Sequence, residues 1–157
     1  MIEESAKKAA IAWVCVDGGP DLAVWCLQVD PDLCLVTGPG EQDVPGLGNA
    51  ERVRVTLRGD HGGAIVSYPV TVTRIKPESE RWEPVTTLLA SKRLNASGPT
   101  EDLIARWAKD CGVWALSPAG DPLSLSDGSG AAEPRPTSAA SATRKPFKLH
   151  RVPDKRA

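Results

Sequence analysis

The sequence predicts a mainly β protein, built as a small antiparallel barrel with two or three helices packed at its openings. Apolar, β-forming stretches recur between residues 11 and 75, separated by turns rich in Gly, Pro and Asp. Two of these stretches alternate strictly between apolar and polar residues. Two later segments repeat their apolar residues at helical spacing. The 157 residues, 41% of them hydrophobic, suffice for one core of ordinary size.

The first three predicted strands are 11–16, 22–29 and 33–37. The turns between them are DGGP at 17–20 and DPD at 30–32, whose residue types favour chain reversal. All three strands are almost continuously apolar, which predicts burial on both faces.

The next two strands carry the clearest pattern. In 52–58 (RVRVTLR) valine and leucine alternate with arginine and threonine, which predicts a strand with one buried face. The same alternation resumes in 64–75 (AIVSYPVTVTRI), where Pro69 predicts a sheet edge or a bulge. Between them lies RGDHGG (58–63), which we interpret as a hairpin loop with His61 in solvent rather than in catalysis.

Two helices are predicted at 78–93 and at 100–111. For the second, Thr100 is the expected N-terminal cap and Gly112 the expected C-terminal stop. A short strand at 113–117 then closes the domain before Pro118.

Composition changes sharply at Pro118, so we divide the chain into a domain of residues 1–118 and a tail of residues 119–157. The tail is rich in Ala, Ser, Pro and Gly and has few large apolar residues, which predicts disorder. Its net charge of +3 makes it mildly basic, whereas the domain carries about −4.

Bulk properties exclude several classes of function. The net charge of −1 gives the whole molecule no general attraction for nucleic acid or acidic lipid. The longest apolar runs are too short to span a bilayer, and the N-terminus does not read as a secretory signal, so we expect a cytoplasmic protein. The four cysteines form no CxxC pair, so we expect free buried thiols and no metal site.

The order of these elements resembles the FMN-binding split-barrel family, which is pyridoxamine 5'-phosphate oxidase-like. Residues 13–30 are similar to the opening hairpin of that family, 32–40 to its third strand, and 52–75 to its central hairpin. The resemblance covers about residues 5–120. It implies a six-stranded antiparallel split β-barrel with two or three peripheral helices.

The resemblance also implies a ligand and a partner. Family members are typically homodimers that hold FMN in a groove between subunits, where basic residues grip its phosphate. Carried over to this chain, it implies these cofactor-binding residues: Thr37, Gly38, Arg54, Thr56, Arg58, Lys92, Arg93 and Asn95. Many members also place a cation in the loop after the third strand, but loop 38–51 has only the charges Glu41, Asp43 and Glu51.

Each of these residues also has a purely structural interpretation. Arginine and threonine alternating on a strand usually form a solvated face. The cations of 91–95 suit a helix C-terminus as well as they suit a phosphate. Among the tryptophans, Trp25 could stack on a flavin ring, and the others are expected in the core: Trp13, Trp82, Trp107 and Trp114.

Three functions remain open from the sequence. The first is an FMN-dependent oxidoreductase acting on a small organic substrate, whose chemistry the flavin would supply, so that no catalytic residue can be named. The second is a non-catalytic split-barrel module that binds flavin, deazaflavin or haem and has lost the loop cation. The third, ranked last, assigns a role to the basic segment 144–156, which could touch nucleic acid or an acidic partner.

Overall fold

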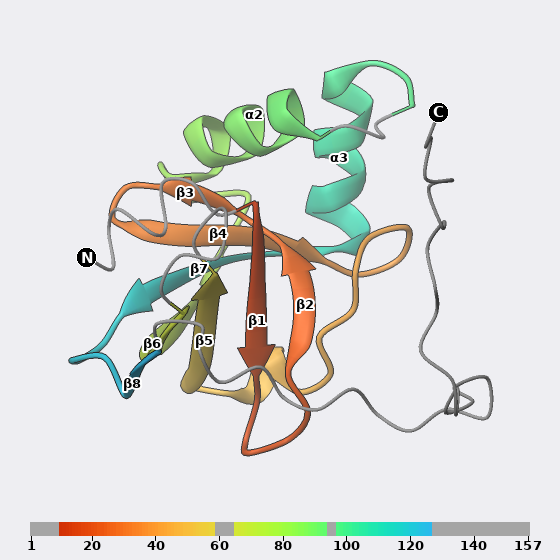
Figure 1. Cartoon of the computed structure of the whole chain (residues 1–157). Helices are drawn as coiled ribbons and strands as arrows, with labels where there is room; N and C mark the ends of the chain where they lie inside the picture. The colour runs from red at the N-terminus through yellow and green to blue at the C-terminus, as the bar shows by residue number, and fades with distance from the viewer. Residues whose placement is uncertain (1–9, 59–64, 94–96, 127–157) are drawn as a thin grey trace, which may run out of the picture.

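A β-barrel carrying two helices on one side forms the body of the chain in this computed structural model (Figure 1). The structure describes residues 10–58, 65–93 and 97–126. The elements in chain order are β1 (Ile11–Cys15), β2 (Leu22–Trp25), β3 (Leu27–Val29), β4 (Asp32–Thr37), the 3-10 helix η1 (Leu47–Asn49), β5 (Arg52–Arg58), β6 (Ile65–Ile75), α2 (Trp82–Lys92), α3 (Thr100–Asp110), β7 (Gly112–Pro118) and β8 (Ser124–Ser126).

The sheet is antiparallel and almost closed on itself. Its strand order is β2-β1-β5-β6-β7-β4-β3, and β8 pairs with β6 beside this path. The two edge strands, β2 and β3, follow each other in the chain and are separated only by Cys26. One stretch of chain therefore lies along both edges of the sheet, which is how the sheet curls into a barrel.

The predicted number of six strands is therefore wrong. The stretch predicted as one strand, 22–29, changes neighbour at Cys26, because its first half pairs with β1 and its second half with β4. At the break, the Cys26 N–H donates to the carbonyl of Ala10 at 3.1 Å. The further strand, β8, lies in the segment assigned to the tail, where the Leu123 N–H also donates to the carbonyl of Ser67 at 2.7 Å. Residues 127–157, the rest of that segment, lie outside the described residues.

The predicted central hairpin is confirmed. Strands β5 and β6 pair antiparallel, from Arg52 opposite Thr71 to Arg58 opposite Ile65. The predicted loop between them lies outside the described residues. The expected edge or bulge at Pro69 is wrong, since β6 is an inner strand in unbroken register with β5. Proline is tolerated there because its other side faces the point where pairing passes from β7 to β8.

The barrel interior is filled by the apolar face of these strands. On β5, Val53, Val55 and Leu57 are buried and the alternate residues face outward, as the sequence pattern predicts. Tyr68 of β6 and Trp114 of β7 lie in the same core. The outer face of β5 is thus left with the polar side chains.

A second core lies between the barrel and the helices (Figure 1). Strand β4 is buried on both faces, as predicted: Leu33 and Leu35 join the barrel core, whereas Cys34 and Val36 pack with the helical layer. Trp107 of α3 is fully buried in this layer. All four cysteines are buried, and burial raises the pKa of the Cys26 and Cys34 thiols to about 12.

Helix α2 begins later than predicted, and the residues predicted to cap and to stop α3 do neither. Helix α2 starts at Trp82 rather than at 78, because residues before it form turns and Arg81 reaches back to the buried carboxylate of Asp32 at 2.6 Å. In α3 the cap position is occupied by Pro99, and Thr100 is the first residue of the helix. Gly112 begins β7 rather than ending α3 in a left-handed conformation. No helix within the described ranges is long and apolar enough to cross a membrane.

Candidate functional site

The predicted cofactor residues fall into two groups on different parts of the barrel. Arg54, Thr56 and Arg58 lie on the outer face of β5, whereas Thr37 and Gly38 lie at the end of β4. In the sheet, β6 and β7 separate these two strands. Arg93, at the end of α2, belongs to the second group through its contact with the loop after β4. Lys92 is exposed at the end of α2, and Asn95 lies outside the described residues.

The first group faces outward because the apolar residues of β5 turn into the barrel. Thr56 lies between Trp13 of β1 and Ser67 of β6 in the sheet register. Its hydroxyl is 2.7 Å from that of Ser67, and either oxygen can donate. The hydroxyl that donates within the pair has no hydrogen left, so only the other one can donate to a ligand. Thr56 is partly buried and Ser67 is buried.

Arg58 covers the ring of Trp13, with its guanidinium carbon 5.7 Å from the ring centroid. Trp13 is only partly buried, so the expectation that it belongs to the core is wrong. It alternates with Ala12 and Val14, which do point into the barrel. A cation over an indole at a partly exposed site contributes about 0.5–1 kcal/mol. This contact is weak enough for Arg58 to leave the indole and bind a ligand instead.

Arg54 is held by a surface ion pair. Its Nη2 donates to Oδ1 of Asp21 at 3.0 Å, and the two side chains are 44% and 48% exposed. The hydrogen bond to Asp21 raises the pKa of Arg54. Exposed pairs of this kind stabilise a protein by about 1 kcal/mol at most, so a phosphate can displace the carboxylate.

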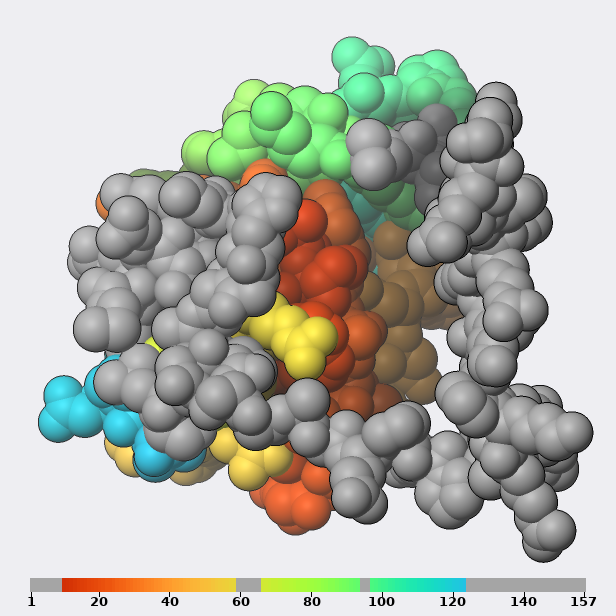
Figure 2. Space-filling model, in the orientation of Figure 1, coloured from red at the N-terminus to blue at the C-terminus, as the bar shows by residue number. Residues whose placement is uncertain are grey.

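Together these residues form what we call the β5 face: Trp13, Arg54, Thr56, Arg58 and Ser67. Two guanidinium groups, two hydroxyls and an indole come from three adjacent strands. The helices lie above the barrel, next to β3 and β4, and atoms of β1 and β5 are in view below them (Figures 1 and 2). The residue types suit a planar ring that carries an anionic group.

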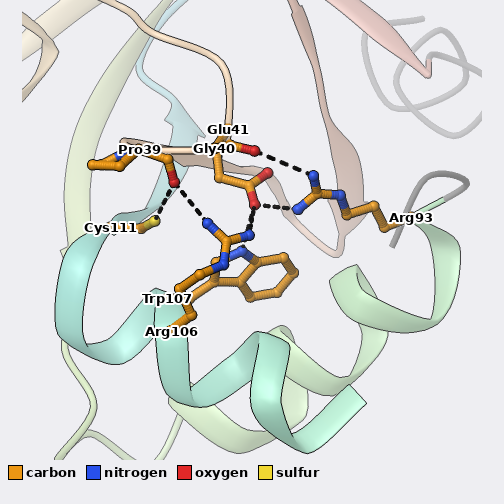
Figure 3. Close-up of polar contacts among 7 residues, drawn as sticks. All are labelled: Pro39, Gly40, Glu41, Arg93, Arg106, Trp107 and Cys111. Carbon is orange, nitrogen blue, oxygen red and sulfur yellow. Dashed lines mark hydrogen bonds and ion pairs between the residues drawn. The ribbon is translucent and has the colours of Figure 1, made fainter. Parts of the chain in front are cut away.

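The second group surrounds one carboxylate (Figure 3). Glu41, in the loop after β4, has a side chain only 7% exposed. Its Oε1 accepts hydrogen bonds from Nη2 of Arg106 at 2.6 Å, from Nε1 of Trp107 at 2.9 Å and from Nη1 of Arg93. We call Glu41, Arg93, Arg106 and Trp107 the Glu41 cluster. The two cations come from different helices, because Arg93 directly follows α2 and Arg106 lies within α3.

The same arginines also bind the backbone of the loop (Figure 3). Arg106 Nη1 donates to the carbonyl of Pro39 at 2.6 Å, and Arg93 Nη2 donates to the carbonyl of Gly40 at 3.3 Å. Gly38 packs against the end of α3, because a Cβ there would lie 3.0 Å from Cα of Cys111, and its φ of 133° suits glycine. The Glu41 cluster thus fastens the β4 loop to the helical layer.

Side chains of the second group are therefore engaged within the chain. Arg93 binds Glu41, and the hydroxyl of Thr37 accepts a hydrogen bond from Nε1 of Trp114 at 2.8 Å. Loop 38–51 has no cation of its own, and Arg93 and Arg106 bring two beside it from the helices. The carboxylate of Glu41 neutralises one of these two positive charges. On the β5 face, by contrast, no carboxylate of the described residues pairs with Arg58.

Sequence reasoning missed several residues in both places. Trp13 and Ser67 had a usable signal, since strict alternation with buried neighbours places them on the outer face with Arg58. Glu41 and Arg106 had none, because the pair is separated by 65 residues and joins a loop to a helix. Only the packing of α3 against the end of β4 brings them together.

Comparisons with solved structures identify the fold. The chain matches the haem storage protein HutZ from Vibrio cholerae with a TM-score of 0.56 and 11% identity, over 79% of this chain and 92% of that one. It matches a candidate general stress protein 26 from Jannaschia sp. CCS1 with a TM-score of 0.50 and 13% identity, over 74% and 70%. A candidate pyridoxamine 5'-phosphate oxidase from Listeria innocua gives a TM-score of 0.46 and 14% identity, over 80% and 93%.

No model of a known protein family matches the chain, and no curated protein matches its sequence. At identities of 11% and 13% the structural likeness shows the fold alone, and that fold is the split barrel expected from the order of elements.

Proposed function

We propose that this chain is a split-barrel flavoprotein that binds FMN on the β5 face and acts as an oxidoreductase on a small organic substrate. The observation that carries the proposal is the β5 face itself, where an indole, two arginines and two hydroxyls lie together on adjacent strands. Their chemistry fits both parts of FMN, a planar ring and a phosphate.

Each side chain of the β5 face has a definite role in this proposal. Arg54 and Arg58 hold the phosphate, which carries nearly two negative charges and accepts bidentate hydrogen bonds from guanidinium groups. Ser67 donates to the hydroxyl oxygen of Thr56, and the Thr56 hydroxyl donates to one of the remaining phosphate oxygens. Trp13 packs against the ring once Arg58 has moved to the phosphate. The bound flavin would supply hydride transfer, and the protein would supply position and charge.

A second copy of the chain completes this site in the proposal, as in homodimers of the family it resembles. Ile11, next to Trp13 on the outer side of β1, is 42% exposed, although it is a large apolar residue. A partner barrel laid against β1 would bury Ile11 and exclude water from the ring. Analytical ultracentrifugation tests this assembly, with Ile11→Asp expected to shift the equilibrium to monomer.

Titration of the full chain with FMN tests the ligand. We expect binding to change flavin fluorescence, and riboflavin, which lacks the phosphate, to bind at least about tenfold more weakly because it forfeits the charge-assisted hydrogen bonds. Arg58→Gln should abolish most of that difference between FMN and riboflavin. Lys109→Gln, an exposed cation on α3, is the matched control and should leave it unchanged. Equal binding of FMN by the Arg58→Gln variant and the wild type would refute the assignment.

Turnover needs a separate measurement. The FMN-loaded protein is mixed with NADH or NADPH without oxygen, and flavin absorbance is followed. Loss of the oxidised spectrum within seconds to minutes supports an oxidoreductase. A protein that binds FMN tightly but is reduced by neither donor is better described as a binding module.

A haem-binding module is the second candidate function. It is favoured by the fold shared with HutZ, a haem storage protein. Haem is also planar and carries two carboxylates, which Arg54 and Arg58 could bind. Titration with haemin separates the two candidates. A sharp Soret band that is lost in His61→Ala, which removes a candidate axial ligand of the iron, would favour haem over FMN.

A further inference from the structure

A groove runs between α2 and α3 on the side of the helical layer that faces away from the barrel core. Its volume is about 670 Å³, and it is lined by residues from both helices. Trp82 of α2 and Ile104 of α3 are only partly buried there, although both also pack against the helical core. The groove therefore presents an apolar floor that the described residues leave open.

Two acidic residues lie beside this apolar floor. Glu83 and Glu101 line the groove and are exposed, each in the first turn of its helix. Small side chains, Ala105 and Ala108, leave room between the helices. The groove suits an occupant with one or two large apolar side chains flanked by cations.

One segment of the chain has that composition. Residues 144–151 read RKPFKLHR, with four cations, no acid, and the apolar side chains of Phe147 and Leu149. We propose that residues 144–151 of this chain dock in the groove between α2 and α3. Phe147 enters the apolar floor beside Trp82, and Lys145 and Lys148 meet Glu83 and Glu101.

The length of chain allows this contact. Seventeen residues separate Ser126, where the described residues end, from Arg144. An extended chain of this length spans about 55 Å. A domain of this size has a radius of gyration of about 13 Å and is about 35 Å across. The segment can therefore reach the groove from any point on the surface.

Zero-length cross-linking of the full chain tests the contact. A carbodiimide joins a lysine amine to a carboxylate only when the two groups touch. We expect amide links from Lys145 or Lys148 to Glu83 or Glu101, identified by mass spectrometry. Phe147→Ala keeps both lysines and should lower the yield of these links at least about fivefold, because it removes the apolar anchor. Ala105→Arg, which brings a cation into the groove, should have the same effect.

Leu123→Ala is the matched control, since Leu123 is 63% exposed and precedes the segment, and its yield should equal that of the wild type. Mixing chains labelled with nitrogen-14 and nitrogen-15 shows whether the links form within one chain, as proposed. Mixed-label links would overturn the proposal in favour of a second copy as occupant. Links spread equally over exposed acids outside the groove, such as Glu51 and Glu78, or an absence of links, would overturn it as well. None of these outcomes depends on the ligand of the β5 face.

Discussion

The β5 face and the Glu41 cluster both contain two arginines, but the two places use them differently. In the Glu41 cluster, Arg93 and Arg106 share one carboxylate that is only 7% exposed. On the β5 face, Arg54 has an exposed partner and Arg58 lies over an indole. The number of cations is the same, so what differs is how far their partners are removed from water.

This difference separates arginines that maintain the fold from arginines available to a ligand. A carboxylate out of water needs its cations, because leaving it unpaired costs several kcal/mol. An arginine at the surface loses little when it changes partner. Mutations in the two places should therefore have opposite signatures, one in stability and the other in ligand affinity.

The largest expected effect is on stability, at Glu41. Glu41→Gln keeps an acceptor for Trp107 but removes the charge that Arg93 and Arg106 share. We expect the free energy of unfolding to fall by about 2–3 kcal/mol, below the range for fully buried pairs because both arginines are partly exposed. Urea denaturation measures this, and Glu51→Gln, at an exposed acid, should change it by less than about 0.5 kcal/mol. Similar midpoints for the two variants would remove the distinction between the regions.

The next effect is on affinity, at the β5 face. Arg54→Gln and Arg58→Gln should each raise the Kd for FMN about tenfold or more, because each removes a charge-assisted hydrogen bond to the phosphate. Their free energy of unfolding should fall by no more than about 1 kcal/mol. Arg93→Gln should do the reverse, lowering stability without changing the Kd. An Arg93→Gln variant that loses FMN binding while its urea midpoint is unchanged would move the ligand to the Glu41 cluster.

The two threonines sharpen the comparison further. Thr37→Val leaves the indole N–H of Trp114 without its acceptor, so we expect a loss of about 1–2 kcal/mol in stability and an unchanged Kd for FMN. Thr56→Val should weaken FMN binding severalfold and change stability less. Paired denaturation and titration of both variants check this, and a common response in both assays would show that the two sites are not separate.

The smallest effect is expected at Asp21. Asp21→Asn removes the exposed carboxylate that competes for Arg54, so we expect FMN to bind about two- to threefold more tightly. Stability should change by less than about 1 kcal/mol. Isothermal titration at low and high salt measures both the gain and its screening. Weaker binding by Asp21→Asn would indicate that Asp21 positions Arg54 for the ligand.

Much of the barrel was predictable because each of its strands is marked by a local sequence pattern. Alternation in 52–58 placed Val53, Val55 and Leu57 inside, and turn residues separated the first strands. The break at Cys26 was not predictable, because both halves of 22–29 are mostly apolar and only their different neighbours divide them. The same limit applies to Pro69. An inner strand tolerates this proline because, on the side away from β5, pairing changes from β7 to β8 at this position.

Local periodicity was thus enough to define the strands, their buried faces and the polar side of β5, because a side chain's direction in a strand follows from its position in the alternation. The assignment of arginines to a ligand or to the fold was not contained in any local pattern. It depends on Glu41, which meets Arg93 and Arg106 across 52 and 65 residues of chain. Burial of a charge is a property of the packed molecule, so the partners of these arginines emerge only when the helices close over the end of β4.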